Sequence, residues 1–97
     1  MDTTTNQEYD SADNGNLTDY SHTLYLVYFE VAEVNSIAQQ VILQHIGADR
    51  ESSLKKVDFG YEVALPVQVI PEIVRDMSAQ GVAVYQVVRK GKLEGLW

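Results

Sequence analysis

Cysteine is absent from this chain of 97 residues. Disulfides, thiolate metal sites and a thiol nucleophile are therefore excluded. Basic residues are also scarce, because seven Lys and Arg stand against 14 Asp and Glu, for a formal net charge of −7. Binding to a phosphate backbone needs a surplus of cations, so this composition argues against a nucleic-acid partner.

Long apolar runs are missing as well. No stretch approaches the roughly 20 apolar residues that span a bilayer, and the N-terminus lacks the basic start and apolar core of a signal peptide. We therefore expect a cytoplasmic protein without direct membrane insertion. The glycines are dispersed and no GxxxxGK[ST] phosphate loop occurs, so we also expect no nucleotide or other cofactor.

The composition changes abruptly near Ser21. Residues 1–22 contain five acidic residues, no Lys or Arg and almost no aliphatic side chains. This composition predicts a disordered acidic leader, followed by a single domain over residues 23–97 that is nearly neutral. The leader is interpreted as a solubilising extension, with a docking arm for a basic partner as the alternative.

The first half of the domain predicts a strand and a helix. Leu24–Val31 is dense in aromatic and β-branched residues, which is typical of a central strand. A helix over Ser36–Ile46 then carries its apolar residues on one face, and Gly47 ends it. Asn35 or Ser36 is expected to cap this helix by accepting a backbone N–H of the first turn.

The second half predicts two short strands, a helix and a last strand. Leu54–Phe59 and Tyr61–Leu65 alternate in polarity, with the chain reversal expected at Gly60. Pro71 suits the first turn of a helix that extends towards Gly81. The last strand is expected to cover residues 82–88 and to end at the basic cluster Arg89, Lys90 and Lys92, read as a solvated edge, or alternatively as a contact for an acidic partner.

The resulting order is βαββαβ, which predicts an α+β, ferredoxin-like domain with a four-stranded antiparallel sheet and two helices on one face. The first strand carries Tyr25, Tyr28 and Phe29. These aromatic residues exceed what one sheet face and two short helices require. Part of this surface is therefore expected to contact a partner.

The search for catalytic or metal-binding residues predicts none. His22 lies at the end of the leader and His45 in the last turn of a helix, where a cation interacts favourably with the helix dipole. Two histidines without a third convergent ligand form no metal site. Asp49, Glu51 and Asp58 occupy a polar stretch without the burial that would shift a pKa, so they are interpreted as solvated side chains.

The second half of the domain resembles a known family. Its motifs are VALP at residues 63–66, IPEIVR at 70–75, GVAV at 81–84, and Leu93-Glu94 shortly before the aromatic Trp97. In this order they resemble the C-terminal accessory domain of ATP-binding subunits from drug and bacteriocin-export ABC transporters. That family has a strand ending near proline, an "IPELVRxLxxxG" helix, a "GVxV" strand and a closing "SLExxF" element. The similarity spans about Leu24–Trp97, with legible motifs only from Val63 onward.

The chain departs from that family in three respects. Lys92 stands where a small hydroxyl residue is usual, and Trp97 replaces the phenylalanine. The ATPase domain is missing, and the acidic leader stands in its place. We therefore expect either a detached domain or fragment, or a free-standing relative that uses the fold for something else.

The resemblance implies a non-enzymatic regulatory or interaction domain, with no catalytic residue to carry over. Its expected partner is a second copy, giving a homodimer, or a larger transporter ATPase. Trp97 is interpreted as the anchor of a short terminal element that folds back onto the domain or onto a partner. The candidate interface residues are Tyr25, Tyr28, Leu93, Leu96 and Trp97.

Two other functions remain open on the same topology. An ACT-like sensor of small molecules would bind ligands at a dimer interface near the turn Ala32–Ser36, although that turn lacks a glycine for close backbone approach. A small dimeric αβ-barrel enzyme would need a polar cluster facing the sheet cavity, for which His45, Tyr25 and Tyr28 are the only candidates.

Overall fold

The computed structural model of the protein describes residues 23–97. The predicted disorder of residues 1–22 lies outside the described residues. The helices and strands follow in the order β2 (Thr23–Ala32), α1 (Ile37–Ile46), η1 (Ala48–Ser53), β3 (Lys55–Val57), β4 (Gly60–Leu65), η2 (Val67–Val69), α2 (Ile70–Ala79) and β5 (Ala83–Leu96), where η marks a short 3-10 helix.

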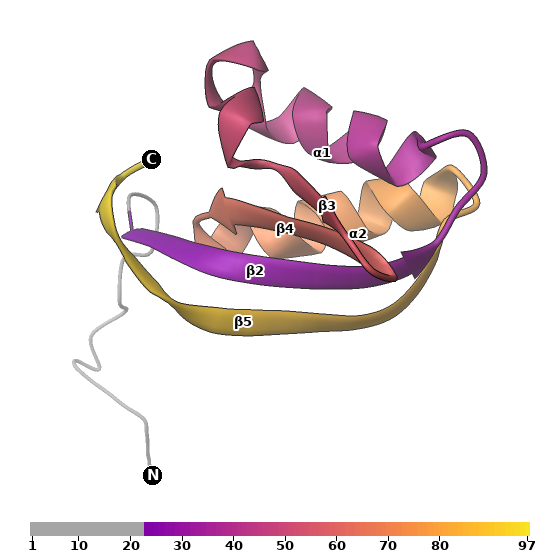
Figure 1. Ribbon diagram of the computed structural model, residues 1–97. Coiled ribbons are helices and arrows are strands. Elements are labelled where there is room, and N and C mark those ends of the chain that lie inside the picture. Colours follow the sequence, from indigo (N-terminus) through magenta and orange to yellow (C-terminus); the bar gives the residue numbers. More distant parts are fainter. Residues whose placement is uncertain (1–22) are drawn as a thin grey trace, which may run out of the picture.

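The strands form one antiparallel sheet in the order β3-β4-β2-β5. The first and third strands of the domain thus lie in the centre, and the second and fourth lie at the edges. Both α-helices cover the same face of the sheet (Figure 1). The predicted α+β, ferredoxin-like arrangement is confirmed, and within residues 23–97 no helix covers the opposite face of the sheet.

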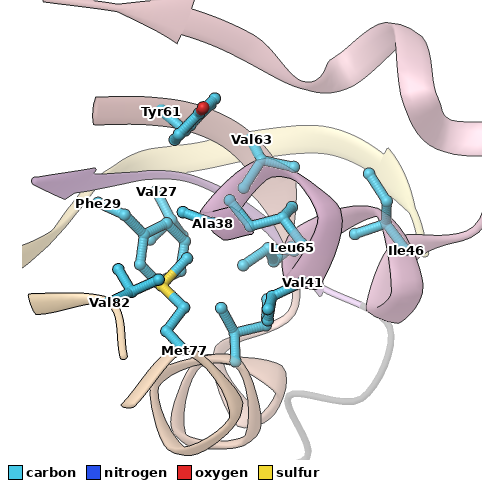
Figure 2. Close-up of a cluster of buried hydrophobic side chains, with 12 residues drawn as sticks. Val27, Phe29, Ala38, Val41, Ile46, Tyr61, Val63, Leu65, Met77 and Val82 are labelled. Carbon is cyan, nitrogen blue, oxygen red and sulfur yellow. The ribbon is translucent and has the colours of Figure 1, made fainter. Parts of the chain in front are cut away.

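The core lies between this sheet and the two helices. Alternate residues of β2 and β4, such as Val27, Phe29 and Val63, are fully buried against helix residues, among them Ile42 and Met77. Figure 2 shows how these side chains converge from the strands and both helices. The strand period of two and the helix period of 3.6 therefore bring their apolar sides to one layer.

The cap of α1 differs from the prediction. Neither Asn35 nor Ser36 caps the helix through its side chain; both residues have positive φ, 58° and 57°. Instead Glu33 Oε1 accepts a hydrogen bond from the Ala38 N–H at 2.8 Å. The left-handed backbone of the turn lets the longer carboxylate of Glu33 reach the unsatisfied N–H of the first helical turn.

The chain reversal between β3 and β4 is at Asp58-Phe59, so the prediction of Gly60 was wrong. Val57 pairs with Gly60, which is the first residue of β4. The positive φ belongs to Phe59, at 75°. Gly60 is needed for another reason: a Cβ built there would lie 1.8 Å from the backbone oxygen of Phe29.

The last strand is longer than predicted. It does not end at the basic cluster but continues to Leu96, which pairs with Thr23 at the start of β2. The β2–β5 register shifts between Leu26 and Val27 and between Glu30 and Val31. Basic side chains on an edge strand can extend into solvent, so a run of charges does not interrupt the backbone pairing.

Candidate functional site

The sheet face that carries no helix is the candidate functional site, and we call it the open face. Along β2, Val27 and Phe29 are buried towards the helices, so their neighbours Leu26, Tyr28 and Glu30 point to the open face. All three are half-buried. Their cross-strand partners share this face, which adds Ala64 and Glu62 from β4 and Val88 and Gln86 from β5.

Tyr28 lies at the centre of the open face, between Glu62 on β4 and Val88 on β5. Lys90 Nζ donates to Glu62 Oε2 at 2.6 Å. On the next pair of residues, Gln86 Nε2 donates to Glu30 Oε1 at 3.0 Å. An aromatic ring is thus surrounded by polar pairs that link β5 to both central strands.

The electrostatics of this face favour a neutral phenol. Partial burial raises the pKa of Tyr28, and the carboxylates of Glu30, Asp58 and Glu62 raise it further. The ammonium of Lys90 acts in the opposite direction. Tyr28 therefore presents a hydroxyl and an apolar ring, and it offers no phenolate nucleophile at neutral pH.

A shallow hollow of about 280 Å³ adjoins Tyr28. It is lined by Tyr28, Val57, Asp58, Phe59, Glu62 and Lys90. Phe59 is 76% exposed and is the most exposed large hydrophobic residue among the described side chains of residues 23–97. Its carbonyl accepts a hydrogen bond from the Val31 N–H at 3.0 Å, which fixes the hairpin turn against β2.

Phe59 has an unfavourable backbone conformation. A φ of 75° is unusual for an aromatic residue and costs about 1–2 kcal/mol relative to the right-handed region. Exposure of the ring to water gives no compensating burial. A residue that is both strained and exposed at the rim of a hollow points to a functional contact there.

The structure places the predicted interface residues at separate positions. Tyr28 is on the open face, whereas Tyr25 packs beside the core on the helix side, with the Arg89 guanidinium 4.9 Å from its ring centre. Leu93 lines a second hollow, beside Lys92. Leu96 pairs through its backbone with Thr23, and its side chain lies outside the description.

Trp97 is half-buried and packs beside the core, under the Arg50 guanidinium at 4.3 Å. The C-terminal end of β5 curls towards the helix side of the sheet (Figure 1). The terminal residue therefore contacts its own domain. A role of these five residues in binding a partner stays a prediction.

The three residues named for an enzyme do not form one cluster. Tyr25 and Tyr28 point to opposite faces of the sheet. His45 Nε2 lies 2.7 Å from Asp76 Oδ2, and its Nδ1 lies 3.8 Å from Glu72 Oε1, so its ring connects α1 to α2. Within residues 23–97, no group of three or more His, Asp or Glu side chains could hold a metal ion.

Sequence reasoning missed Phe59 and Glu62 as residues that shape the open face, and it did not identify Glu62 as the partner of Lys90. The alternation of residues 54–59 predicts a strand through Phe59, whereas the structure places Phe59 in the exposed turn before Gly60. The pairing of Glu62 with Lys90 had no local signal, because the two residues are 28 positions apart.

In the part of the chain that the structure describes, no helix is both long and apolar enough to cross a membrane. No protein-family model, curated protein or solved structure gives a significant match to this chain.

Proposed function

We propose that this protein is a non-enzymatic interaction domain that binds another protein through the open face. The observation that carries the proposal is Phe59, an exposed aromatic residue held at positive φ on the rim of the hollow beside Tyr28. A central aromatic ring bordered by polar pairs is the usual composition of a protein–protein contact.

The shape of the open face favours a protein over a small molecule as the ligand. Ligand pockets of enzymes and sensors are concave and bury most of their ligand. The hollow beside Tyr28 is shallow, and the surrounding surface is formed by the strands themselves, with Leu26, Ala64 and Val88 as its apolar part. Such a surface suits the face of another folded domain.

The partner is a second copy of the chain or the ATP-binding subunit of an export transporter. The second choice rests only on the sequence motifs shared with the accessory domains of those subunits. The ACT-like alternative would use the turn Ala32–Ser36. There the Glu33 carboxylate already accepts hydrogen bonds from the Ala38 N–H and the Tyr61 hydroxyl, so it is engaged within the domain.

The proposal is tested with Phe59→Asn, because Asn tolerates positive φ and removes the aromatic ring. Self-association is measured by sedimentation velocity over a range of concentrations, and binding to a purified transporter ATP-binding subunit by calorimetry. We expect the variant to weaken the interaction at least about tenfold, as for an aromatic hot-spot residue.

Val34→Asn is the matched control. Val34 is also highly exposed, at 67%, but lies in the β2–α1 turn and does not line the hollow. We expect this variant to associate like the wild type. If the wild-type chain neither self-associates nor binds the subunit, or if both variants behave identically, the proposed function is wrong.

A further inference from the structure

The edge strand β5 offers a second surface, distinct from the open face. It has 14 residues and pairs with β2 alone within residues 23–97, whereas β3 at the opposite edge has only three residues. A long edge strand presents backbone N–H and C=O groups to solvent, and proteins commonly cover such an edge.

Three cations near this strand have no carboxylate partner in residues 23–97. They are Arg89 and Lys92 on β5 and Arg50 in η1. Lys90 differs from them, because it pairs with Glu62 on the open face. Exposed positive charge without compensation favours an acidic ligand.

These cations lie near the point where β2 begins. Lys92 is the cross-strand partner of Tyr25, and the Arg89 guanidinium lies 4.9 Å from the same ring. Arg50 lies over Trp97, next to the Thr23–Leu96 pair. A hollow of about 510 Å³ adjoins Lys92, and its other lining residues are Thr23, Leu93, Glu94 and Gly95.

We propose that the acidic leader, residues 1–22, binds the cationic side of β5 around Arg89 and Lys92 in the same molecule. The leader has five carboxylates and no Lys or Arg, and it joins the domain at Thr23, which lines the hollow beside Lys92. A short tether holds a ligand at an effective concentration on the order of millimolar, so individually weak ion pairs suffice for binding.

The charges on β5 favour the acidic leader, rather than a second copy of the chain, as the segment that binds this edge. Antiparallel pairing of two β5 strands would bring Arg89, Lys90 and Lys92 of one chain close to the same cations of the other. Like charges placed directly across a strand pair are destabilising. The leader brings the opposite sign, and this inference does not depend on the proposed role of the open face.

The experiment uses the full chain with a spin label on the leader. The sequence has no cysteine, so Ser11→Cys provides a single attachment point. Paramagnetic broadening of backbone amide signals by NMR then reports which strands the leader approaches. We expect residues 86–95 to broaden several-fold more than residues 55–57 of β3.

Two charge variants test the cause. Arg89→Gln with Lys92→Gln is expected to remove most of this broadening. The control is the double variant Lys55→Gln with Lys56→Gln, which removes the same amount of charge from the opposite edge. We expect the broadening of β5 signals in this variant to equal that of the wild type. Salt at about 1 M, where the Debye length is about 3 Å, should act like the first pair of substitutions.

Three outcomes would overturn the inference. The first is equal broadening of β3 and β5, and the second is broadening of β5 that persists in the Arg89 and Lys92 variant. The third is broadening that appears when spin-labelled chains are mixed with isotope-labelled chains that carry no spin label. That last result would show that the leader binds another molecule, and therefore that the occupant is not in the same chain.

Discussion

The hydroxyl of Tyr61 donates a hydrogen bond to Glu33 Oε2 at 2.5 Å. The other oxygen of the same carboxylate accepts from the Ala38 N–H at 2.8 Å. One side chain in the β2–α1 turn thus connects the central strand β4 to the start of the first helix. This arrangement compensates for the absence of a capping side chain at Asn35 or Ser36.

Replacing Glu33 by Ala should therefore remove both hydrogen bonds at once. We expect a loss of about 1–3 kcal/mol in the free energy of unfolding, because the buried Tyr61 side chain and the helix N-terminus each lose an acceptor. Urea unfolding followed by circular dichroism measures this change. Glu51→Ala, an exposed substitution, is the control; an equal effect of both variants would contradict the assigned role of Glu33.

The raised pKa of Tyr61 leads to a prediction of how the free energy of unfolding changes at alkaline pH. Burial raises the pKa of Tyr61 from 10.0 to about 12, and the hydrogen bond to Glu33 adds to the effect. Below pH 10 Tyr61 is protonated in both the folded and the unfolded chain, so its contribution to the free energy of unfolding has its full value there. It is lost as the pH rises through about 12, because the unfolded state releases its proton first.

Unfolding experiments between pH 9 and 12 on the wild type and on Tyr61→Phe measure this difference. We expect the variant to be less stable at neutral pH but to lose less stability on going to alkaline pH. Parallel pH profiles of the two proteins would show that Tyr61 does not carry the effect.

The His45–Asp76 contact between the helices makes a prediction for acidic pH. The hydrogen bond to His45, and then that to Arg75, lowers the pKa of Asp76 below its ordinary value of 3.8. The ionised carboxylate therefore stabilises the fold at neutral pH. This contribution is lost as the pH falls through the lowered pKa, because protonation of Asp76 breaks the favourable contact.

Titration of the Asp76 carboxyl signal by NMR checks this assignment. In His45→Gln the pKa of Asp76 should rise towards 3.8, and in Arg75→Gln it should rise by a smaller amount, since His45 is the larger cause. A titration that both substitutions leave unchanged would be inconsistent with the observed geometry.

We expect that adding one methyl group at Gly60 strongly destabilises the fold. A Cβ at this position would overlap the backbone oxygen of Phe29 at 1.8 Å, and backbone in the centre of a sheet cannot move aside easily. We expect Gly60→Ala to reduce the free energy of unfolding by about 3 kcal/mol.

Gly91→Ala is the matched control, because a Cβ on Gly91 meets no atom within 4 Å. Thermal unfolding of both variants is sufficient to compare them. If Gly60→Ala is tolerated as well as Gly91→Ala, the close approach of β4 to β2 does not require a glycine.

We expect substitution of Phe59 to have opposite effects on stability and on binding. Phe59→Asn should raise the free energy of unfolding by about 1 kcal/mol, since Asn adopts positive φ at lower cost. The same variant should bind the partner of the open face less well. Urea unfolding measures the first effect; a loss of stability would show that the exposed ring supports the fold rather than a contact.

Much of the fold could be predicted from local patterns. The alternation in β2 and β4 and the spacing of apolar residues in both helices identify which side of each element is buried. Their order then limits the arrangement to a sheet with helices on one face. The positions of the turns are harder to predict from the sequence. The reversal at Asp58-Phe59 places a non-glycine residue at positive φ, against the local preference that favoured Gly60.

The candidate site could be predicted only in part. Tyr28 was identified, because its place in a central strand follows from the sequence. Its neighbours were not, since Glu62 and Lys90 come from strands whose register no local pattern specifies. The length of β5 was underestimated for the same reason, because its last residues are held by pairing with Thr23 and Tyr25 rather than by their own propensity.

The sequence by itself determined the absence of thiol chemistry, the acidic character of residues 1–22, the order of strands and helices, and the residues available to form a core. These properties depend on composition and on short periodic patterns, which act over neighbouring residues. Tertiary structure alone decided that Glu33 caps α1 and binds Tyr61, that Phe59 borders a hollow next to Tyr28, and that Trp97 packs under Arg50. Apart from the local Glu33–Ala38 hydrogen bond, these contacts join residues far apart in the chain, and their geometry is fixed only when the sheet register and the packing of the helices are complete.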